Sequence, residues 1–419
     1  MKAVRPGEFA TLGLSFLYFL LLLASYYVLR PVRDGLVAAM GADHVKILNL
    51  IVLVVMLMLT PVFGWLMARI PRALLLPRIY TFCILNLLIF AFAMANPSWQ
   101  GITTRVFFVW VMVFNMFVVS VFWSFMADIW NEEQARRLFG TIAAGGSIGG
   151  LVGPALANAF AESIGNSGLT LLSATLLSCA MACLIALSRR RFHESPTRAG
   201  QTTTRTTEAA LGGSSIQSIL LVLRSPFLRG IAILVCVTSI GAQFAYIETA
   251  RLANALYESG HELTEFYSRV DFATNAVTLI FQAVVVGFLT TRFGIKAPLL
   301  GIAIIGCLSF IPVGLSPTIA VLATTTVIRR ASEYGLGKPG RDMLYAVTTP
   351  QEKYLAKNVI DTLVYRSSDS IGNLLHTILV GLGFALAGLS AAAGLMLAGS
   401  TFVAWSVAKT YNERARMRR

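Results

Sequence analysis

Two arginines of equal charge lie close together in the first long apolar stretch of the sequence. Arg30 and Arg33 are three residues apart, and Asp34 follows directly. Side chains with this spacing share one face of a helix, and guanidinium groups bind phosphate or carboxylate through two parallel hydrogen bonds. Because Asp34 can pair well with only one of them, the spacing predicts an anion site. The alternative is that both side chains extend toward the membrane surface, with Asp34 as their partner.

Opposite charges with the same spacing occur at Glu248 and Arg251, and again at Arg366 and Asp369. Ionisable groups at membrane depth are costly unless they are paired or hydrated, so they mark candidate functional sites. Each couple is either a self-neutralising structural pair or part of a site. We expect Arg366 and Asp369 to form a pair that favours one conformation of the protein over another. His376 fits a proton relay or a hydrogen-bonded packing residue, and the sequence favours packing.

The candidate residues fall into two groups. Those expected to bind substrate are Arg30, Arg33, Asp34, Glu248, Arg251 and Arg366. Those expected to act in gating or coupling are Arg69, Asp128, Arg292, Asp361 and Asp369. Other charges in apolar stretches are Asp271 and the group Arg329, Arg330 and Glu333, which fits the cytoplasmic end of one span.

The sequence lacks the motifs of catalysis and nucleotide hydrolysis. It has no Ser-His-Asp, Cys-His or paired-carboxylate arrangement and no Walker motif. The glycine-rich segment 143–150 has no lysine and lies in an apolar stretch, which favours close helix packing. Cys179 and Cys183 share a helix face without a nearby histidine or carboxylate, which favours buried thiols over a metal site. We therefore expect a protein that is not an enzyme and uses no cofactor or metal.

Membrane-spanning helices must position these charges. Of the 419 residues, 56% are hydrophobic and 13% are charged, and the mean hydropathy is +0.72. A helix crosses a bilayer with about 20 apolar residues, and stretches that are apolar on every side are typical of helices, not of barrel strands. We expect an all-α membrane protein with twelve transmembrane helices. They are placed at about 9–30, 46–68, 73–95, 103–129, 138–162, 167–188, 218–257, 265–291, 297–314, 317–336, 355–388 and 390–410.

Basic residues gather in every second loop and at both ends of the chain. The opposite loops hold few, so the positive-inside rule places both termini in the cytoplasm of a multi-pass inner-membrane protein. The net charge of +14 arises largely from this asymmetry. Because the basic residues are dispersed over many loops, they do not predict a nucleic-acid partner. The expected partners are the lipid bilayer and a small-molecule substrate.

The sequence contains an internal repeat. Two elements recur at the same displacement of 223 residues. In the first, Gly64, Leu66 and Arg69 recur as Gly287, Leu289 and Arg292 (287 − 64). In the second, residues 147–149 recur as 370–372 (370 − 147). Between the copies, residues 192–217 have the Thr, Gly and Ser composition of a linker. We therefore expect two six-helix bundles, 1–191 and 218–419, joined by a cytoplasmic linker. Secondary transporters are commonly built this way, with substrate bound near the midplane between the repeats.

The first repeated element resembles the loop motif of the major facilitator superfamily, Gly-x-Leu-x-Asp-Arg followed by Gly and basic residues. The matching residues are Gly64, Leu66, Arg69 and Arg72, then Gly287, Leu289, Arg292, Gly294 and Lys296, while Ala68 and Thr291 replace the acidic position. The resemblance implies two pseudo-symmetric bundles in which spans one, four, seven and ten line the cavity.

Three longer stretches, 26–34, 122–137 and 331–366, are similar to the nucleotide transporter family of ATP/ADP translocases. This resemblance implies nucleotide exchange by an antiporter. Two departures bear on the substrate, since Pro31 stands where the family has an acid and Asp369 where it has a lysine. The second change replaces a phosphate-seeking cation with an anion, so the substrate need not be a nucleotide.

Two functions remain open. The first is a secondary active transporter of an anionic solute, such as a nucleotide or a phosphorylated metabolite, by exchange or coupling to an ion. The alternative is a facilitator-type exporter of a siderophore, drug or other amphipathic solute, which would have an apolar, aromatic pocket. A scaffold that transports nothing is disfavoured because it has little reason to retain costly buried charges.

Overall fold

The structure is a computed structural model of the chain and describes residues 5, 7–69, 72–130, 132–194, 215–257, 260–349, 356–357 and 359–417. These residues form helices joined by short turns, and no strand occurs among them. The all-α fold expected from the composition is confirmed.

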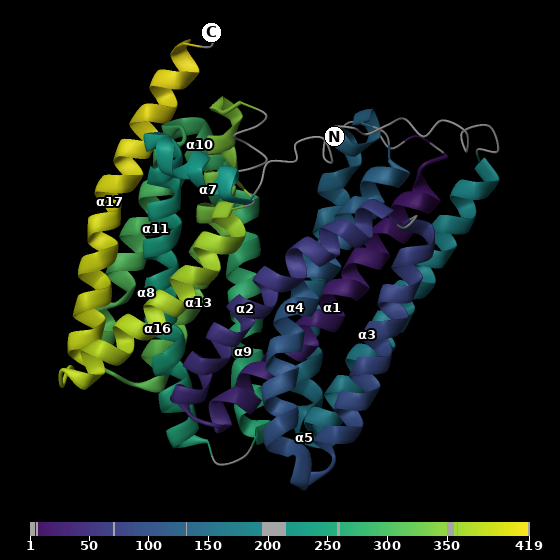
Figure 1. The fold of residues 1–419 in the computed structure, drawn as a ribbon, viewed down its shortest axis with the longest axis horizontal. Helices are drawn as coiled ribbons and strands as arrows, with labels where there is room; N and C mark the ends of the chain where they lie inside the picture. The colour runs from purple at the N-terminus through teal and green to yellow at the C-terminus, as the bar shows by residue number, and fades with distance from the viewer. Residues whose placement is uncertain are drawn as a thin grey trace. The chain divides into compact units, whose positions relative to one another are not determined.

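Long helices carry the first half of the sequence (Figure 1). They are α1 (Phe9–Ala39), α2 (Ala42–Arg69), α3 (Arg72–Met94), α4 (Gln100–Ile129), which follows the 3₁₀ turn η1 (Pro97–Trp99), and α5 (Glu132–Glu194). Two predicted spans, 138–162 and 167–188, both fall within α5. Gly165 breaks the helix between them with a φ of 61°, a conformation that glycine adopts at little cost.

The second half has shorter and more interrupted helices. They are α7 (Ser215–Arg224), α8 (Pro226–Leu256), α9 (Gly260–Ile280), α10 (Val286–Phe293), α11 (Lys296–Ser309), α12 (Ile311–Leu315), α13 (Ile319–Ser332), α14 (Lys338–Leu344), α16 (Tyr365–Gly381) and α17 (Leu386–Met417). Three π-helical turns, η3 (Phe281–Val285), η4 (Glu333–Gly337) and η6 (Ile360–Val364), interrupt the α-helices, and η5 (Tyr345–Val347) is a 3₁₀ turn.

The predicted spans of the second half contain irregular turns, and one of them begins later than predicted. Predicted span 265–291 passes through η3, span 317–336 passes into η4, and span 355–388 contains η6 and ends its α-helix at Gly381. The predicted span 218–257 breaks before Pro226, because a proline has no N–H to donate and favours the first turn of a helix. The predicted linker 192–217 is helical at both ends, and its residues 195–214 lie outside the described part of the chain.

Eight described helical segments are long and apolar enough to cross a membrane. One of them, 137–190, contains two predicted spans, so together they account for nine of the twelve. The other three, 46–68, 317–336 and 355–388, lie in α2, in α13 with η4, and in η6 with α16. Spans 317–336 and 355–388 contain several ionisable residues, among them Arg329, Arg330 and Glu333 in the first and Asp361, Arg366 and Asp369 in the second.

The chain forms two compact units. The first comprises 1–41, 54–205 and 257–272, and the second comprises 42–53, 206–256 and 273–419. Each unit thus takes one short segment from the other half of the sequence. The predicted boundaries of the two bundles stay a prediction.

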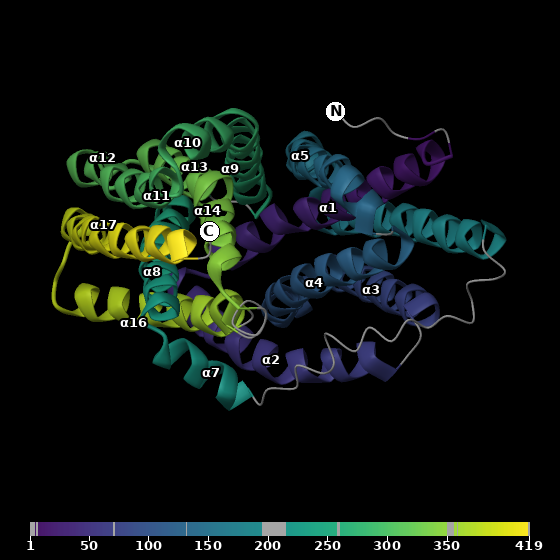
Figure 2. The ribbon, with the colours of Figure 1, turned by 90° about the horizontal axis from the view of Figure 1, so that it is seen from above.

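In the first unit, α1 packs along α5, and α3 and α4 lie side by side (Figures 1 and 2). The α1–α5 contact is close because small residues of α5 face the backbone of α1. A Cβ atom added at Gly145, Gly149 or Gly153 would lie 2.5, 2.3 or 2.6 Å from an atom of α1. The glycine-rich segment therefore packs helices together, as the sequence predicted.

In the second unit, α8 contacts α13, α16 and α17, and α11 also packs on α17 (Figure 1). Apolar side chains such as Phe244, Phe310 and Leu397 form one core between these helices. A separate core surrounds Phe227, Leu299 and Tyr345. The helices are held by these cores, so polar side chains among them are positioned by packing.

The start of α1 is fastened to the start of α5 by Glu8. Its carboxylate accepts hydrogen bonds from Arg137 Nη2 at 2.7 Å, Gln134 Nε2 at 3.0 Å and the backbone N–H of Arg5 at 3.0 Å. Arg5 also forms an ion pair with Glu133 at 2.8 Å. The hydrogen bond from Arg137, followed by that from the Arg5 backbone, lowers the pKa of Glu8 from 4.5 to about 2.

We expect Glu8→Gln to lower the melting temperature in detergent at pH 7. In the unfolded chain Glu8 takes up a proton near pH 4.5, whereas the folded protein keeps it ionised down to about pH 2. The stabilisation is therefore complete above pH 4.5 and lost as the pH falls toward 2. The difference between the wild type and Glu8→Gln should shrink over that range. Glu133→Gln, which removes a carboxylate from an exposed ion pair, is the control and should change the melting temperature little. A melting-temperature difference between the wild type and Glu8→Gln that does not change with pH would contradict the stabilising role of ionised Glu8.

Candidate functional site

A buried cluster of two arginines and two carboxylates lies in the first unit. Arg33 Nη2 and Nε contact Asp34 Oδ1 at 2.7 and 2.9 Å. Arg30 Nε lies 3.5 Å from Asp271 Oδ2 of α9 and 4.0 Å from Asp34 Oδ2. The side chain of Arg30 is 13% exposed, and the other three are 4% exposed or less. The four charges of this cluster balance.

The cluster differs from the expectation for Arg30 and Arg33 in one respect. Asp34 pairs closely with Arg33, as expected, but Arg30 has a carboxylate of its own in Asp271, from a distant part of the sequence. Extension of Arg33 to the membrane surface does not fit, because the side chain is buried and its guanidinium lies 5.5 Å from the Phe108 ring. A substrate role for Arg30, Arg33 and Asp34 stays a prediction.

In the second unit, Glu248 of α8 joins two basic side chains. Its Oε2 lies 2.8 Å from Arg251 Nη2, and its Oε1 lies 2.7 Å from His376 Nε2 of α16. Glu248 and His376 are both buried, whereas the Arg251 side chain is 54% exposed. The His376 ring also packs edge-on against Phe244, with centroids 5.4 Å apart. The predicted Glu248–Arg251 pair is therefore present, and it is extended by a histidine.

The predicted Arg366–Asp369 pair is also present on α16. Arg366 Nη1 lies 3.5 Å from Asp369 Oδ2, and the Gln243 side chain of α8 also hydrogen-bonds Asp369. The Arg366 guanidinium lies 5.5 Å from the Tyr365 ring. This geometry fits a local pair that holds α16 against α8, and its effect on the transport cycle stays a prediction.

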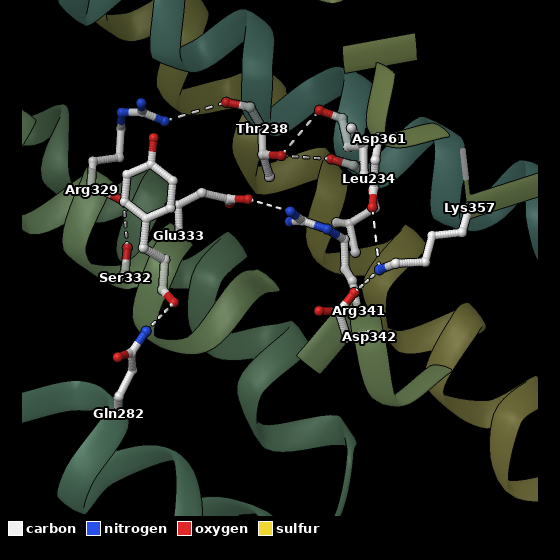
Figure 3. Close-up of polar contacts among 12 residues, drawn as sticks. Leu234, Thr238, Gln282, Arg329, Ser332, Glu333, Arg341, Asp342, Lys357 and Asp361 are labelled. Atoms are coloured by element: carbon white, nitrogen blue, oxygen red, sulfur yellow. Dashed lines mark hydrogen bonds and ion pairs between the residues drawn. The ribbon is translucent and has the colours of Figure 1, made fainter. Parts of the chain in front are cut away.

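Two groups of ion pairs join η4 to α14 and α14 to η6 (Figure 3). Glu333 Oε1 contacts Arg341 Nη2 at 2.5 Å, and Lys357 Nζ contacts both Asp342 and, at 3.2 Å, Asp361 Oδ2. All five lie in the stretch 331–366 that resembles the nucleotide transporters. The structure thus gives Asp361, expected in gating or coupling, a partner in Lys357.

Arg329 of α13 has no such partner. It is 8% exposed, and Nη1 donates to the backbone oxygen of Thr238 at 3.3 Å (Figure 3). Its Nε is buried without a hydrogen bond, and no carboxylate in the described residues lies within ion-pair distance of its guanidinium. The nearby carboxylate of Glu333 contacts Arg341 instead. Arg329 is thus a buried cation that the described part of the chain leaves without an anion.

The remaining predicted residues lie apart from these clusters. Asp128 is half-buried at the end of α4, and Arg292 is exposed on α10 with its guanidinium 5.8 Å from the Phe288 ring. The side chain of Arg69 is outside the described part of the structure.

Sequence reasoning missed the partnership of Glu248 and His376 and the isolation of Arg329. The two members of the first pair are 128 residues apart, so no local spacing connects them. One signal was available, since Arg366, Asp369, Asn373 and His376 follow one another at intervals of three and four residues. That spacing puts a polar stripe on one face of α16.

Comparison with known proteins identifies the fold. The profile of the Major Facilitator Superfamily matches residues 8–340. A bacterial homologue of the iron transporter ferroportin, solved in an inward-facing state, is similar with a TM-score of 0.67 and 15% identity over 97% of this chain and 100% of that one. A POT family transporter in complex with a thioalcohol-conjugated peptide gives 0.65 and 14% over 96% of each chain. The nucleoside transporter NupG gives 0.55 and 13% over 96% of this chain and 98% of that one.

No curated protein matches the chain. Because the identities are 13–15%, the solved structures show that the fold is shared, and the substrates of those proteins do not identify the substrate of this chain. The family profile covers most of the sequence, and all three structures are transporters rather than enzymes. The chain belongs to the Major Facilitator Superfamily and is a multi-pass membrane transporter that acts by alternating access.

Proposed function

We propose that this protein is a secondary active transporter of an anionic solute, one that carries phosphate or carboxylate groups. A nucleotide or phosphorylated metabolite is the kind of compound that fits. The observation that carries the proposal is Arg329, a buried guanidinium without a carboxylate partner in the described residues.

Burial of an uncompensated charge costs several kcal/mol, so a structural role alone does not account for Arg329. Its guanidinium donates to the Thr238 oxygen and has further N–H groups for another acceptor. A guanidinium binds a phosphate or carboxylate through two parallel hydrogen bonds, which would supply the missing anion. The balanced charges of Arg30, Arg33, Asp34 and Asp271 make that cluster a weaker candidate for the same task.

The resemblance of the stretch 331–366 to nucleotide transporters agrees with an anionic substrate, because Arg329 lies two residues before it. The replacement of a family lysine by Asp369 argues against naming ATP itself. We place the protein in the inner membrane with both termini cytoplasmic, on the basis of the basic loops.

Uptake into proteoliposomes tests the proposal with labelled phosphate, ATP, a hexose phosphate and a dicarboxylate, beside a neutral nucleoside and a cationic drug. For the anion that moves, Arg329→Gln should raise the KM by about 10- to 150-fold, the equivalent of about 1.5–3 kcal/mol for a charge-assisted hydrogen bond. Arg330→Gln removes the same charge one residue further along the chain and should have a smaller effect. Movement of only neutral or cationic compounds, or equal effects of both variants, would reject the anion proposal and favour the exporter of amphipathic solutes.

A further inference from the structure

Polar side chains are buried along the contact between α8 and α16 in the second unit. We call this set the α8–α16 seam, and it consists of Gln243, Glu248, Asp369, Asn373 and His376, none more than 9% exposed. Among the described residues, several atoms of the seam have no hydrogen-bond partner: Gln243 Oε1, both amide atoms of Asn373, His376 Nδ1, and Glu248 Oε2, which has an ion-pair contact instead. Buried polar atoms are almost always satisfied, so this concentration indicates a place where protons or other small polar species bind.

The protonation states at one end of the seam follow from the contacts of Glu248. Arg251 contacts its Oε2 at 2.8 Å and so favours the ionised carboxylate. An ionised carboxylate can only accept, so His376 Nε2, at 2.7 Å from Oε1, must carry the hydrogen of that bond. The other ring nitrogen, Nδ1, then has a lone pair that is buried and faces no donor among the described residues.

The two ion pairs on the helices that flank His376 each contain one positive and one negative charge. On α8, Glu248 and Arg251 balance each other, and on α16, Arg366 and Asp369 do the same. The other elements that contact α8 or α16 carry Arg329 and Arg330 on α13, Asp361 on η6 and Arg224 at the end of α7. Among the other neighbours, α17 has no charged residue from Leu386 to Ala408, and α11 has none from Ala297 to Ser309.

We propose that His376 Nδ1 is the binding site of a proton that this transporter couples to its solute. A proton from water binds the Nδ1 lone pair and gives an imidazolium whose Nε2–H still donates to Glu248, so no other bond is broken. The carboxylate of Glu248 stabilises the imidazolium, and loss of the Nδ1 proton restores the neutral ring. This proposal rests on secondary active transport as the proposed function and names the coupling ion. It replaces the packing role that the sequence favoured for His376.

Proton binding can be measured without any solute. The chain has four histidines, so the ring carbon signals of purified protein labelled with [13C]histidine can be assigned by single substitutions. We expect the signal that disappears in His376→Gln to move with pH in the wild type, because the ring gains and loses a proton. In Glu248→Gln, which keeps the histidine, the pH response of the same signal should change. A His376 signal that does not change from pH 4 to pH 10 would overturn the proposal.

The second measurement uses proteoliposomes that contain the pH dye pyranine, with the anion that proves to be transported in the uptake panel. Wild-type protein should move protons together with that anion, and His376→Gln should lose accumulation driven by a pH gradient while it keeps exchange of labelled for unlabelled anion. Retained exchange shows that the variant is folded. Anion transport without proton movement would overturn this proposal and leave the anion proposal intact. If no anion moves but the His376 signal responds to pH, the anion proposal fails and the proton site stands.

Discussion

Arg329→Met is expected to raise the melting temperature of the purified transporter while it abolishes transport of the anionic solute. The guanidinium is 8% exposed and has no carboxylate partner among the described residues, so the empty protein bears the cost of burying it. That cost is on the order of several kcal/mol, and methionine removes it because its unbranched, flexible side chain is apolar. A rise in stability together with a loss of function is typical of a residue kept for binding.

The measurement is thermal unfolding in detergent, followed by tryptophan fluorescence, with and without the anion. Wild-type protein should be stabilised by the anion through mass action, and Arg329→Met should not respond to it. Arg341→Met is the matched control, because this buried arginine pairs with Glu333 at 2.5 Å and its loss leaves a carboxylate unpaired. That variant should be destabilised. A fall in the melting temperature of Arg329→Met would show that Arg329 has a structural partner instead.

Gly149→Ala is expected to disrupt the first unit although it adds only one methyl group. The new Cβ would lie 2.3 Å from the Leu20 oxygen and 3.0 Å from the Ala24 nitrogen, both backbone atoms of α1. Backbone cannot rotate away as a side chain can, so α1 and α5 would have to separate along their contact. Overpacking of this kind typically costs about 1–3 kcal/mol, and more where the neighbours are rigid.

Gly140→Ala supplies the control within the same helix. Nothing lies within 4 Å of a Cβ built at Gly140, so alanine there should stabilise the helix by about 0.5–1 kcal/mol. Melting temperatures and the fraction of monodisperse protein after solubilisation would measure both variants. Equal behaviour of the two would mean that α1 and α5 are not in close contact.

Hydrophobicity was sufficient to predict the all-α membrane fold, and the spacing of small residues was sufficient to predict the packing face of α5. Both signals are local: a span is a run of neighbours, and a packing face repeats every three or four residues. The pairs Glu248–Arg251 and Arg366–Asp369 were predicted for the same reason, since each is formed within a single turn of one helix.

The partners of Arg30, Glu248 and Arg329 could not be found in this way. Asp271 is 241 residues beyond Arg30, and His376 is 128 residues beyond Glu248, so both contacts depend on how separate helices pack. The π-helical turns were missed for a related reason. Each one shifts the helical phase without changing hydrophobicity, and a window average does not register the shift.

The 223-residue repeat relates the α1–α5 contact to the α8–α16 seam. The displacement carries Leu20 to Gln243 (20 + 223), and Gly149 to Gly372 (149 + 223). A Cβ on Gly149 would meet Leu20, and one on Gly372 would meet Gln243 at 3.0 Å, so the two copies keep the same pair of facing positions.

Around that conserved pair of positions the two copies have diverged in chemistry. The same displacement carries Ala143, Gly146, Gly150 and Gly153 to Arg366, Asp369, Asn373 and His376. The repeat therefore predicts two copies of one helix pair. The copy formed by α1 and α5 has small apolar residues at these positions, and the copy formed by α8 and α16 has ionisable or polar ones. We infer that, after the duplication that the repeat predicts, charge was acquired in the second copy only, so the two copies should not be interchangeable.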